Sequence, residues 1–97
     1  MQKLTETEIT EKLRSLTDWH FKEGSISREA KFANFKDAFS VMTRIAFECE
    51  AQNHHPNWSN VYNTLLINLN THDVGGITEK DFKLAQTIET ILTSQLI

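Results

Sequence analysis

The chain has 97 residues, the size of a single domain, because chains usually divide into several domains only above about 250 residues. Its content of 39% hydrophobic and 24% charged residues is that of an ordinary globular protein and excludes disordered and low-complexity classes. Ten basic against thirteen acidic residues give a net charge of −3 with no basic cluster, so we expect no direct contact with nucleic acid.

The N-terminal third predicts a helix followed by a hairpin. Thr5 and Glu8 have the spacing of a capping box, in which each side chain bonds the other residue's backbone, so a helix is expected over residues 6–16. Apolar and polar residues then alternate with a period of two on either side of a Gly-Ser turn. This alternation predicts strands over residues 19–23 and 25–32.

The middle of the chain predicts a long helix and then one or two strands. Asn34 is a favourable N-cap for a helix that should end near Asn53, because Pro56 disfavours helical backbone at the residue before it. Alternation over residues 58–72 predicts strand, with a turn near Asn63. The expected buried face consists of Val61, Leu65, Ile67 and Leu69.

A last helix follows a Gly-Gly loop, with Thr78 as its cap and Asp81 as the acidic capping partner. The whole chain, residues 1–97, is therefore predicted to be one α+β domain in the order α-β-β-α-β-β-α. We expect an antiparallel sheet of about four strands with three helices packed on one face. No run of 18 apolar residues and no apolar leader occur, so we expect a cytoplasmic protein without a membrane span.

Three of the four histidines lie where binding sites are usually built. His54 and His55 come at the end of the long helix, and His72 ends the strand region before the Gly-Gly loop. Glu50 precedes His54 by four residues, so a helix that continued this far would let the carboxylate orient the imidazole. His20 alternates outward on the first strand and is assigned no role.

The residues alone leave three interpretations of these histidines open. They are ordinary surface histidines, a metal site, or acid–base groups that work without a metal. Adjacent histidines tend to point apart, and helical zinc pairs favour a spacing of four, so the metal interpretation has little support. Imidazole exchanges protons near neutral pH, which favours acid–base chemistry. The single cysteine, Cys49, lies on an apolar helical stripe and is expected in the core rather than as a nucleophile.

The segments around these histidines resemble one known family. They are residues 50–58 (EAQNHHPNW), 60–63 (NVYN), 71–73 (THD), Gly76 and residues 78–81 (TEKD). In order and spacing this set resembles pterin-4a-carbinolamine dehydratases, and the predicted elements extend the resemblance to nearly the whole chain.

The resemblance implies an activity that needs neither a metal nor another cofactor. Enzymes of this family expel water from a 4a-hydroxytetrahydropterin left by aromatic amino acid hydroxylases and produce the quinonoid dihydropterin. We expect His54 and His72 to act as general acids at the 4a-hydroxyl and His55 to hold the ring and serve as base. The substrate-binding residues are expected to be Glu50, Asn53, Trp58, Asn70, Thr71 and Asp73, with Trp58 stacking on the ring or packing in the core. Asp81 is expected to cap a helix and to support the site.

Two other functions remain open at this level. Animal members of the family are also dimerisation cofactors of a homeodomain transcription factor, so this chain is either an enzyme, a protein-interaction module, or both. A metal-binding protein is the third hypothesis. The resemblance also implies a homodimer or homotetramer, with a hydroxylase of the same pathway as a further partner. The uncharged strand region and the apolar C-terminal helix, which ends on Ile91, Leu92, Leu96 and Ile97, favour self-association.

Overall fold

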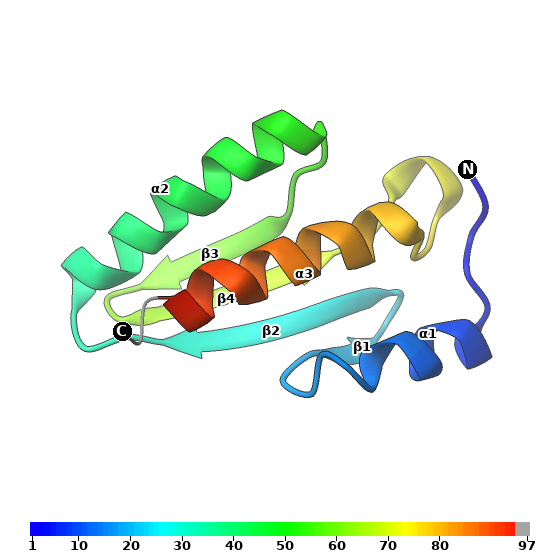
Figure 1. Ribbon diagram of the computed structural model, residues 1–97, viewed down its shortest axis with the longest axis horizontal. Coiled ribbons are helices and arrows are strands. Elements are labelled where there is room, and N and C mark those ends of the chain that lie inside the picture. Colours follow the sequence, from blue (N-terminus) through cyan, green and yellow to red (C-terminus); the bar gives the residue numbers. More distant parts are fainter. Residues whose placement is uncertain (95–97) are drawn as a thin grey trace.

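The computed structural model describes residues 1–94, which form one layer of helices on one face of a four-stranded antiparallel sheet (Figure 1). The predicted fold class and element order are confirmed. In chain order the elements are α1 (Glu6–Leu13), β1 (His20–Lys22), β2 (Ser25–Lys31), α2 (Phe35–Gln52), β3 (Asn57–Val61), β4 (Thr64–Leu69), the 3₁₀ turn η1 (His72–Val74) and α3 (Glu79–Ser94). The strand order is β1-β2-β4-β3, so β1 and β3 are the edges.

The sheet has one face toward the helices and one open face. Ile26, Leu65, Ile67 and Leu69 are fully buried toward α2 and α3, as the alternation predicted for the last three. Val61 was predicted on the same buried face, but it is 76% exposed. A two-residue turn joins β3 to β4 and pairs Val61 with Thr64 rather than with Leu65. The parity of the alternation therefore reverses across the turn, and Val61 lies on the open face.

Local capping explains where the helices begin. The Thr5 side chain accepts a bond from the backbone N–H of Glu8 at 3.1 Å, and the Glu8 side chain accepts one from the backbone N–H of Thr5 at 2.8 Å. The side chain of Asn34 accepts from the backbone of Asp37 at 2.9 Å at the start of α2. The first helix ends at Leu13 rather than the predicted residue 16, although Leu16 is still buried in the core.

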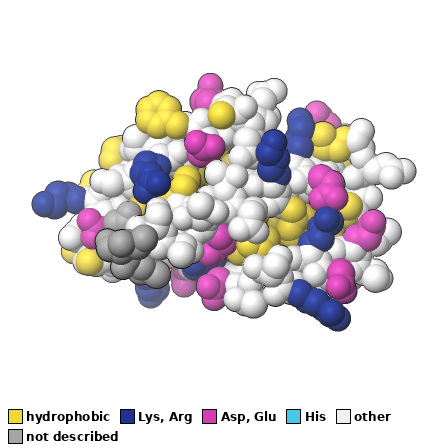
Figure 2. Space-filling model, viewed as in Figure 1, with side chains coloured by type: hydrophobic (Ala, Val, Ile, Leu, Met, Phe, Trp, Pro, Cys, Tyr) yellow, Lys and Arg dark blue, Asp and Glu magenta, His cyan; other side chains and the backbone are white. Residues whose placement is uncertain are grey.

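Two of the four apolar C-terminal residues that were expected to favour self-association are not available at the surface. Ile91 and Leu92 lie on the buried face of α3, and Leu96 and Ile97 lie outside the described residues. Exposed apolar side chains are found on α2 instead, where Phe35, Phe39 and Phe47 form a stripe; Figure 2 shows apolar side chains exposed over this helix. Within residues 1–94, no helix combines the length and apolar character needed to cross a bilayer.

Candidate active site

A cavity of about 380 Å³ lies where the C-terminal end of α2, the start of β3 and the loop after β4 meet. It brings together all three of the predicted histidines, His54, His55 and His72. The other lining residues are Asn53, Pro56, Asn57, Asn68, Asn70, Thr71, Asp73 and Lys80. Four of the predicted substrate-binding residues, Asn53, Asn70, Thr71 and Asp73, are thus at the cavity, whereas Glu50 and Trp58 are not among its lining residues.

The end of α2 sets the direction of the two adjacent histidines. Asn53 adopts a left-handed conformation (φ 51°, ψ 45°), which ends the helix before His54. The backbone N–H of His54 bonds the carbonyl of Cys49 at 3.0 Å, and that of Asn53 bonds the carbonyl of Glu50 at 3.2 Å. This is the Schellman pattern of helix termination, for which asparagine is a tolerated alternative to glycine.

Because the helix ends there, the expected pairing of Glu50 with His54 is wrong. Glu50 instead lies 2.6 Å from His55, Oε2 to Nε2, at an exposed position. The spacing of four residues would have placed Glu50 beside His54 only if the helical turn had continued. The left-handed residue turns His54 inward, where it is 9% exposed, and leaves His55 beside Glu50.

His54 has a different carboxylate partner, Asp81, which is fully buried in the first turn of α3. His54 Nε2 lies 2.6 Å from Asp81 Oδ1. The second oxygen, Oδ2, accepts from the hydroxyl of Thr71 at 2.8 Å and from the backbone N–H of Thr78 at 2.9 Å. The last contact is the predicted capping bond, so Asp81 caps α3 and holds His54 at the same time.

This network determines which nitrogen of His54 can exchange a proton with a ligand. An ionised carboxylate only accepts hydrogen bonds, so the contact with Asp81 places a hydrogen on Nε2. Within the described part of the chain, Nδ1 of His54 has no hydrogen-bond partner, and it is not among the fully buried polar atoms that lack one. Nδ1 is therefore the nitrogen of His54 left free to exchange a proton with a ligand, and His54 lines the cavity.

The same network reaches the loop that carries His72. The hydroxyls of Thr71 and Thr78 lie 2.7 Å apart, and the backbone N–H of Thr71 bonds the carbonyl of Gly76 at 2.7 Å. Since the Thr71 hydroxyl donates to Asp81, the Thr78 hydroxyl donates to Thr71. His72, the next residue, begins the turn η1 and is exposed. A buried set of bonds thus holds both His54 and the backbone beside His72.

Trp58 takes the second of its two expected places, the core, and three lining residues of the cavity were not predicted. Trp58 lies on the helix side of β3, opposite Ile67, and packs half-buried against the core rather than lining the cavity. Asn57, Asn68 and Lys80 line the cavity but were not predicted. The two asparagines are cross-strand partners on the open face, a relation that follows from the register of β3 with β4. Asn57 and Lys80 lie in segments that carry the family resemblance, which was the available sign for these two residues.

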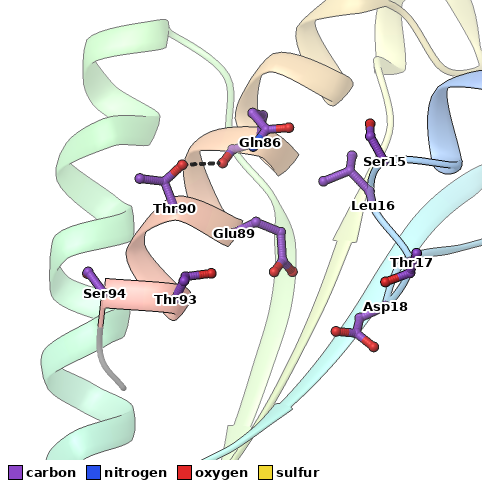
Figure 3. A pocket seen from close by; sticks show the side chains of 9 residues that line it. All are labelled: Ser15, Leu16, Thr17, Asp18, Gln86, Glu89, Thr90, Thr93 and Ser94. Carbon is purple, nitrogen blue, oxygen red and sulfur yellow. Dashed lines mark hydrogen bonds between the residues drawn. The ribbon is translucent and has the colours of Figure 1, made fainter. Parts of the chain in front are cut away.

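Two other features of residues 1–94 were candidates for a second site, the Cys49 thiol and a cavity that Glu89 lines. Burial raises the pKa of the Cys49 thiol to about 11, so it is a protonated core group, as predicted. Residues 1–94 contain no cluster of three or more histidine, cysteine or acidic side chains that would hold a metal ion. A larger cavity of about 490 Å³ lies between α3 and the loop after α1 (Figure 3). Its Glu89 carboxylate is already bonded by Trp19 Nε1 at 2.8 Å and by Arg28 Nε at 2.6 Å.

The fold and the cavity together define a small α+β protein with a histidine-lined site at one end of its sheet. The family model described as pterin 4 alpha carbinolamine dehydratase matches residues 2–91. A protein of Christiangramia forsetii that is provisionally named pterin-4-alpha-carbinolamine dehydratase is 58% identical over 94 residues, 97% of each chain. A protein of Solibacter usitatus with the same provisional name is 52% identical over 92% of this chain and 94% of that protein.

A solved structure agrees with these relatives. The crystal structure described as a transcriptional coactivator/pterin dehydratase from Brucella Melitensis has a TM-score of 0.90 and 39% identity to this chain. The similarity covers 93% of this chain and 98% of that one. The chain therefore belongs to the pterin-4a-carbinolamine dehydratase family.

Proposed function

We propose that the protein converts a 4a-hydroxytetrahydropterin into the quinonoid dihydropterin and water by histidine acid–base catalysis. The observation that carries this proposal is the meeting of three histidines in one cavity, two of them paired with carboxylates. The reaction breaks the bond between C4a and its hydroxyl, removes the proton from N5 and forms the double bond between C4a and N5. No electron is transferred to or from the substrate, so no redox cofactor is required.

The two histidine–carboxylate pairs, His54 with Asp81 and His55 with Glu50, suit different parts of this reaction. His54 is held through Nε2 by buried Asp81, and in its doubly protonated form it gives the Nδ1 proton to the departing hydroxyl, with exposed His72 as the second acid. His55 accepts the proton from N5, and Glu50 stabilises the charged imidazole that results. Well-placed acids and bases contribute about 10²–10⁴-fold each to such steps. Asn53, Asn70, Thr71 and Asp73 line the same cavity, and we expect them to contact the rim of the ring.

A coupled assay tests the activity directly. An aromatic amino acid hydroxylase generates the 4a-hydroxytetrahydropterin, and its ultraviolet absorbance is followed with and without this protein. We expect the protein to accelerate the decay, and an H54A variant to be impaired. Decay at the spontaneous rate at micromolar protein would contradict the proposal. The same assay after dialysis against a chelator tests whether the activity is independent of metals.

Self-association is supported by two surfaces. β3 is an edge strand with no charged residue, and edges of this kind are usually paired or protected by lysine or proline. On α2, the tilted rings of Phe35 and Phe39 lie 5.7 Å apart between centroids, and Phe47 follows two turns further along the helix. We infer a homodimer or homotetramer that uses the β3 edge, the α2 stripe, or both.

A protein-interaction function is the second candidate, and the α2 stripe is the observation that favours it. The relative from Brucella Melitensis carries the description of a transcriptional coactivator as well as that of a dehydratase. An interaction function does not need the buried contact between His54 and Asp81, so loss of dehydration in an H54A variant that still self-associates would separate the two roles.

A further inference from the structure

His72 differs from the other two histidines of the cavity in how its side chain is held. His54 and His55 each lie 2.6 Å from a carboxylate oxygen. Among residues 1–94, the imidazole of His72 has no such carboxylate partner, and the residue is exposed. Its position therefore depends on the backbone of the loop that carries it, residues 71–76. The groups that fix this loop also place His72.

The loop is closed where its two ends meet. Thr71 and Gly76 form an antiparallel bridge, in which the N–H of Thr71 bonds the carbonyl of Gly76 at 2.7 Å. Between them, the N–H of Gly75 bonds the carbonyl of His72 at 3.1 Å. The first end of the loop is anchored in the protein, because the hydroxyl of Thr71 donates to buried Asp81. The second end, at Gly76, is anchored by a different part of the chain.

That second anchor is the segment ahead of α1, residues 3–5, which we call the strap. Figure 1 shows the start of the chain running beside this loop. The backbone N–H of Leu4 bonds the carbonyl of Ile77, the residue after the loop, at 2.7 Å. The side chain of Leu4 packs against the core, and Thr5 caps α1. The strap is thus fixed at its own end and reaches the loop through Leu4.

The strap also lies directly on Gly76. A Cβ at this position would come 2.8–3.0 Å from three carbons of the Lys3 side chain, Cγ, Cδ and Cε. The φ of Gly76 is not positive, so the close approach of Lys3 is what requires glycine here. At Gly75, by contrast, a Cβ would meet nothing within 4 Å. A cavity of about 300 Å³ lies between the strap, the loop and Phe21, so this side of the loop is supported mainly by the strap.

We propose that the strap positions His72 for catalysis. Leu4 holds the second end of the loop through its backbone bond, and Gly76 lets the strap come close enough to form that bond. Neither residue lines the histidine cavity, so both are positioning residues that act through His72. The inference rests on the proposed dehydratase function for the role of His72, but the effect of the strap on the loop can be measured without catalysis.

The variant L4P tests the anchor in the full-length protein. Proline lacks the N–H that bonds Ile77, and position 4 precedes the N-cap, so no helix is interrupted. A displacement of a reacting group by about 1 Å costs up to about 10²-fold, so we expect kcat to fall about 3–30-fold with KM changed less than about twofold. In an H72A background, L4P should change kcat less than about twofold, because the strap acts through His72.

The matched control for lost stability is L13A. Leu13 is a partly buried residue of α1 that packs against the core, but it lines neither the histidine cavity nor the cavity beside the strap. We expect L13A to lower Tm, as L4P does, and to keep wild-type kcat.

A second set of variants tests the contact with Gly76 and decides the matter if L4P fails to fold. G76A adds a Cβ that must displace the Lys3 side chain and with it the strap, so kcat should fall. K3A/G76A removes the three obstructing carbons and should restore kcat. K3A alone keeps the backbone bond of Leu4 and should match the wild type.

Hydrogen exchange measures the hold on the loop directly. We expect L4P to speed the exchange of the Thr71 and Gly75 amides about tenfold or more, with the amides at the centre of β4 unchanged. Unchanged exchange of the loop amides, wild-type kcat in L4P and G76A, or an equal loss from L4P with and without His72 would each overturn the inference. If the wild type does not dehydrate the pterin, the proposed function fails, and the exchange rates still decide whether the strap holds the loop.

Discussion

Replacing Asp81 with asparagine tests whether the buried carboxylate controls the proton on His54. The substitution D81N keeps the size of the side chain but gives it one donor group. If the amide oxygen stays with Thr71 and the backbone of Thr78, both of which donate, then the amide nitrogen faces His54 Nε2. Two donors cannot pair, so the imidazole must move its hydrogen to Nδ1 and accept through Nε2.

The expected effects on activity and stability are therefore very different in size. The protonated imidazole, which gives its Nδ1 proton to the departing hydroxyl, would place a donor against the amide nitrogen and would lose its carboxylate partner, so we expect kcat to fall about 10²–10⁴-fold. The hydrogen bonds are retained in number but lose the charge of the carboxylate, which costs about 1 kcal/mol of unfolding free energy. For a domain of this size that change lowers Tm by about 4–8 °C.

The coupled ultraviolet assay measures kcat, and thermal unfolding followed by circular dichroism measures Tm. D37N is the matched control, because Asp37 is also an acidic residue in the first turn of a helix but does not line the cavity. We expect it to keep wild-type kcat. A D81N variant with more than a tenth of wild-type kcat and a native spectrum would refute the argument that Asp81 sets the tautomer of His54.

Four further predictions follow from the site and the surfaces. H54A and H72A should each lower kcat more than tenfold with native circular dichroism, whereas H20A, on β1 outside the cavity, should match the wild type. Activity should survive dialysis against a chelator, because water loss from the carbinolamine needs only proton transfer. Light scattering at micromolar concentration should give at least twice the 11.2 kDa chain mass. The thiol of Cys49 should react with a disulfide reagent at pH 8 only after denaturation, because burial raises its pKa to about 11.

Each of these predictions has a clear contrary result. Wild-type activity in both H54A and H72A would contradict the catalytic roles of these histidines. Activity that is lost on dialysis and restored only by added zinc would favour a metal site. A monomer of 11.2 kDa would show that neither β3 nor α2 is an interface. Rapid labelling of native Cys49 would contradict its burial.

The raised pKa of Cys49 also predicts how stability depends on pH. Because the pKa of this thiol in the folded protein is about 11, above the ordinary 9.0, its contribution to stability should be complete below pH 9 and should disappear as the pH rises through 11.

Much of the local structure was predictable because it depends on neighbours in the chain. The capping bonds of Thr5, Asn34 and Asp81 join residues three apart, and the buried alternation along β4 has a period of two. Such patterns are visible in the sequence because the geometry of one helical turn or one strand produces them. The three histidines were also recognisable, since their spacing relative to the surrounding residues carried the family resemblance.

The tertiary structure alone decided which side chains meet. Glu50 and His54 have the right spacing for a pair, yet a single left-handed residue between them separates the two. Asp81 reaches His54 across 27 positions, because the start of α3 packs against the end of α2. Likewise, the turn between β3 and β4 determined that Asn57 and Asn68 share the open face with the cavity. Sequence patterns predict contacts within one helix or strand. The contacts of His54 and His55 with carboxylates depend instead on how the helix ends and on how α2 packs against α3.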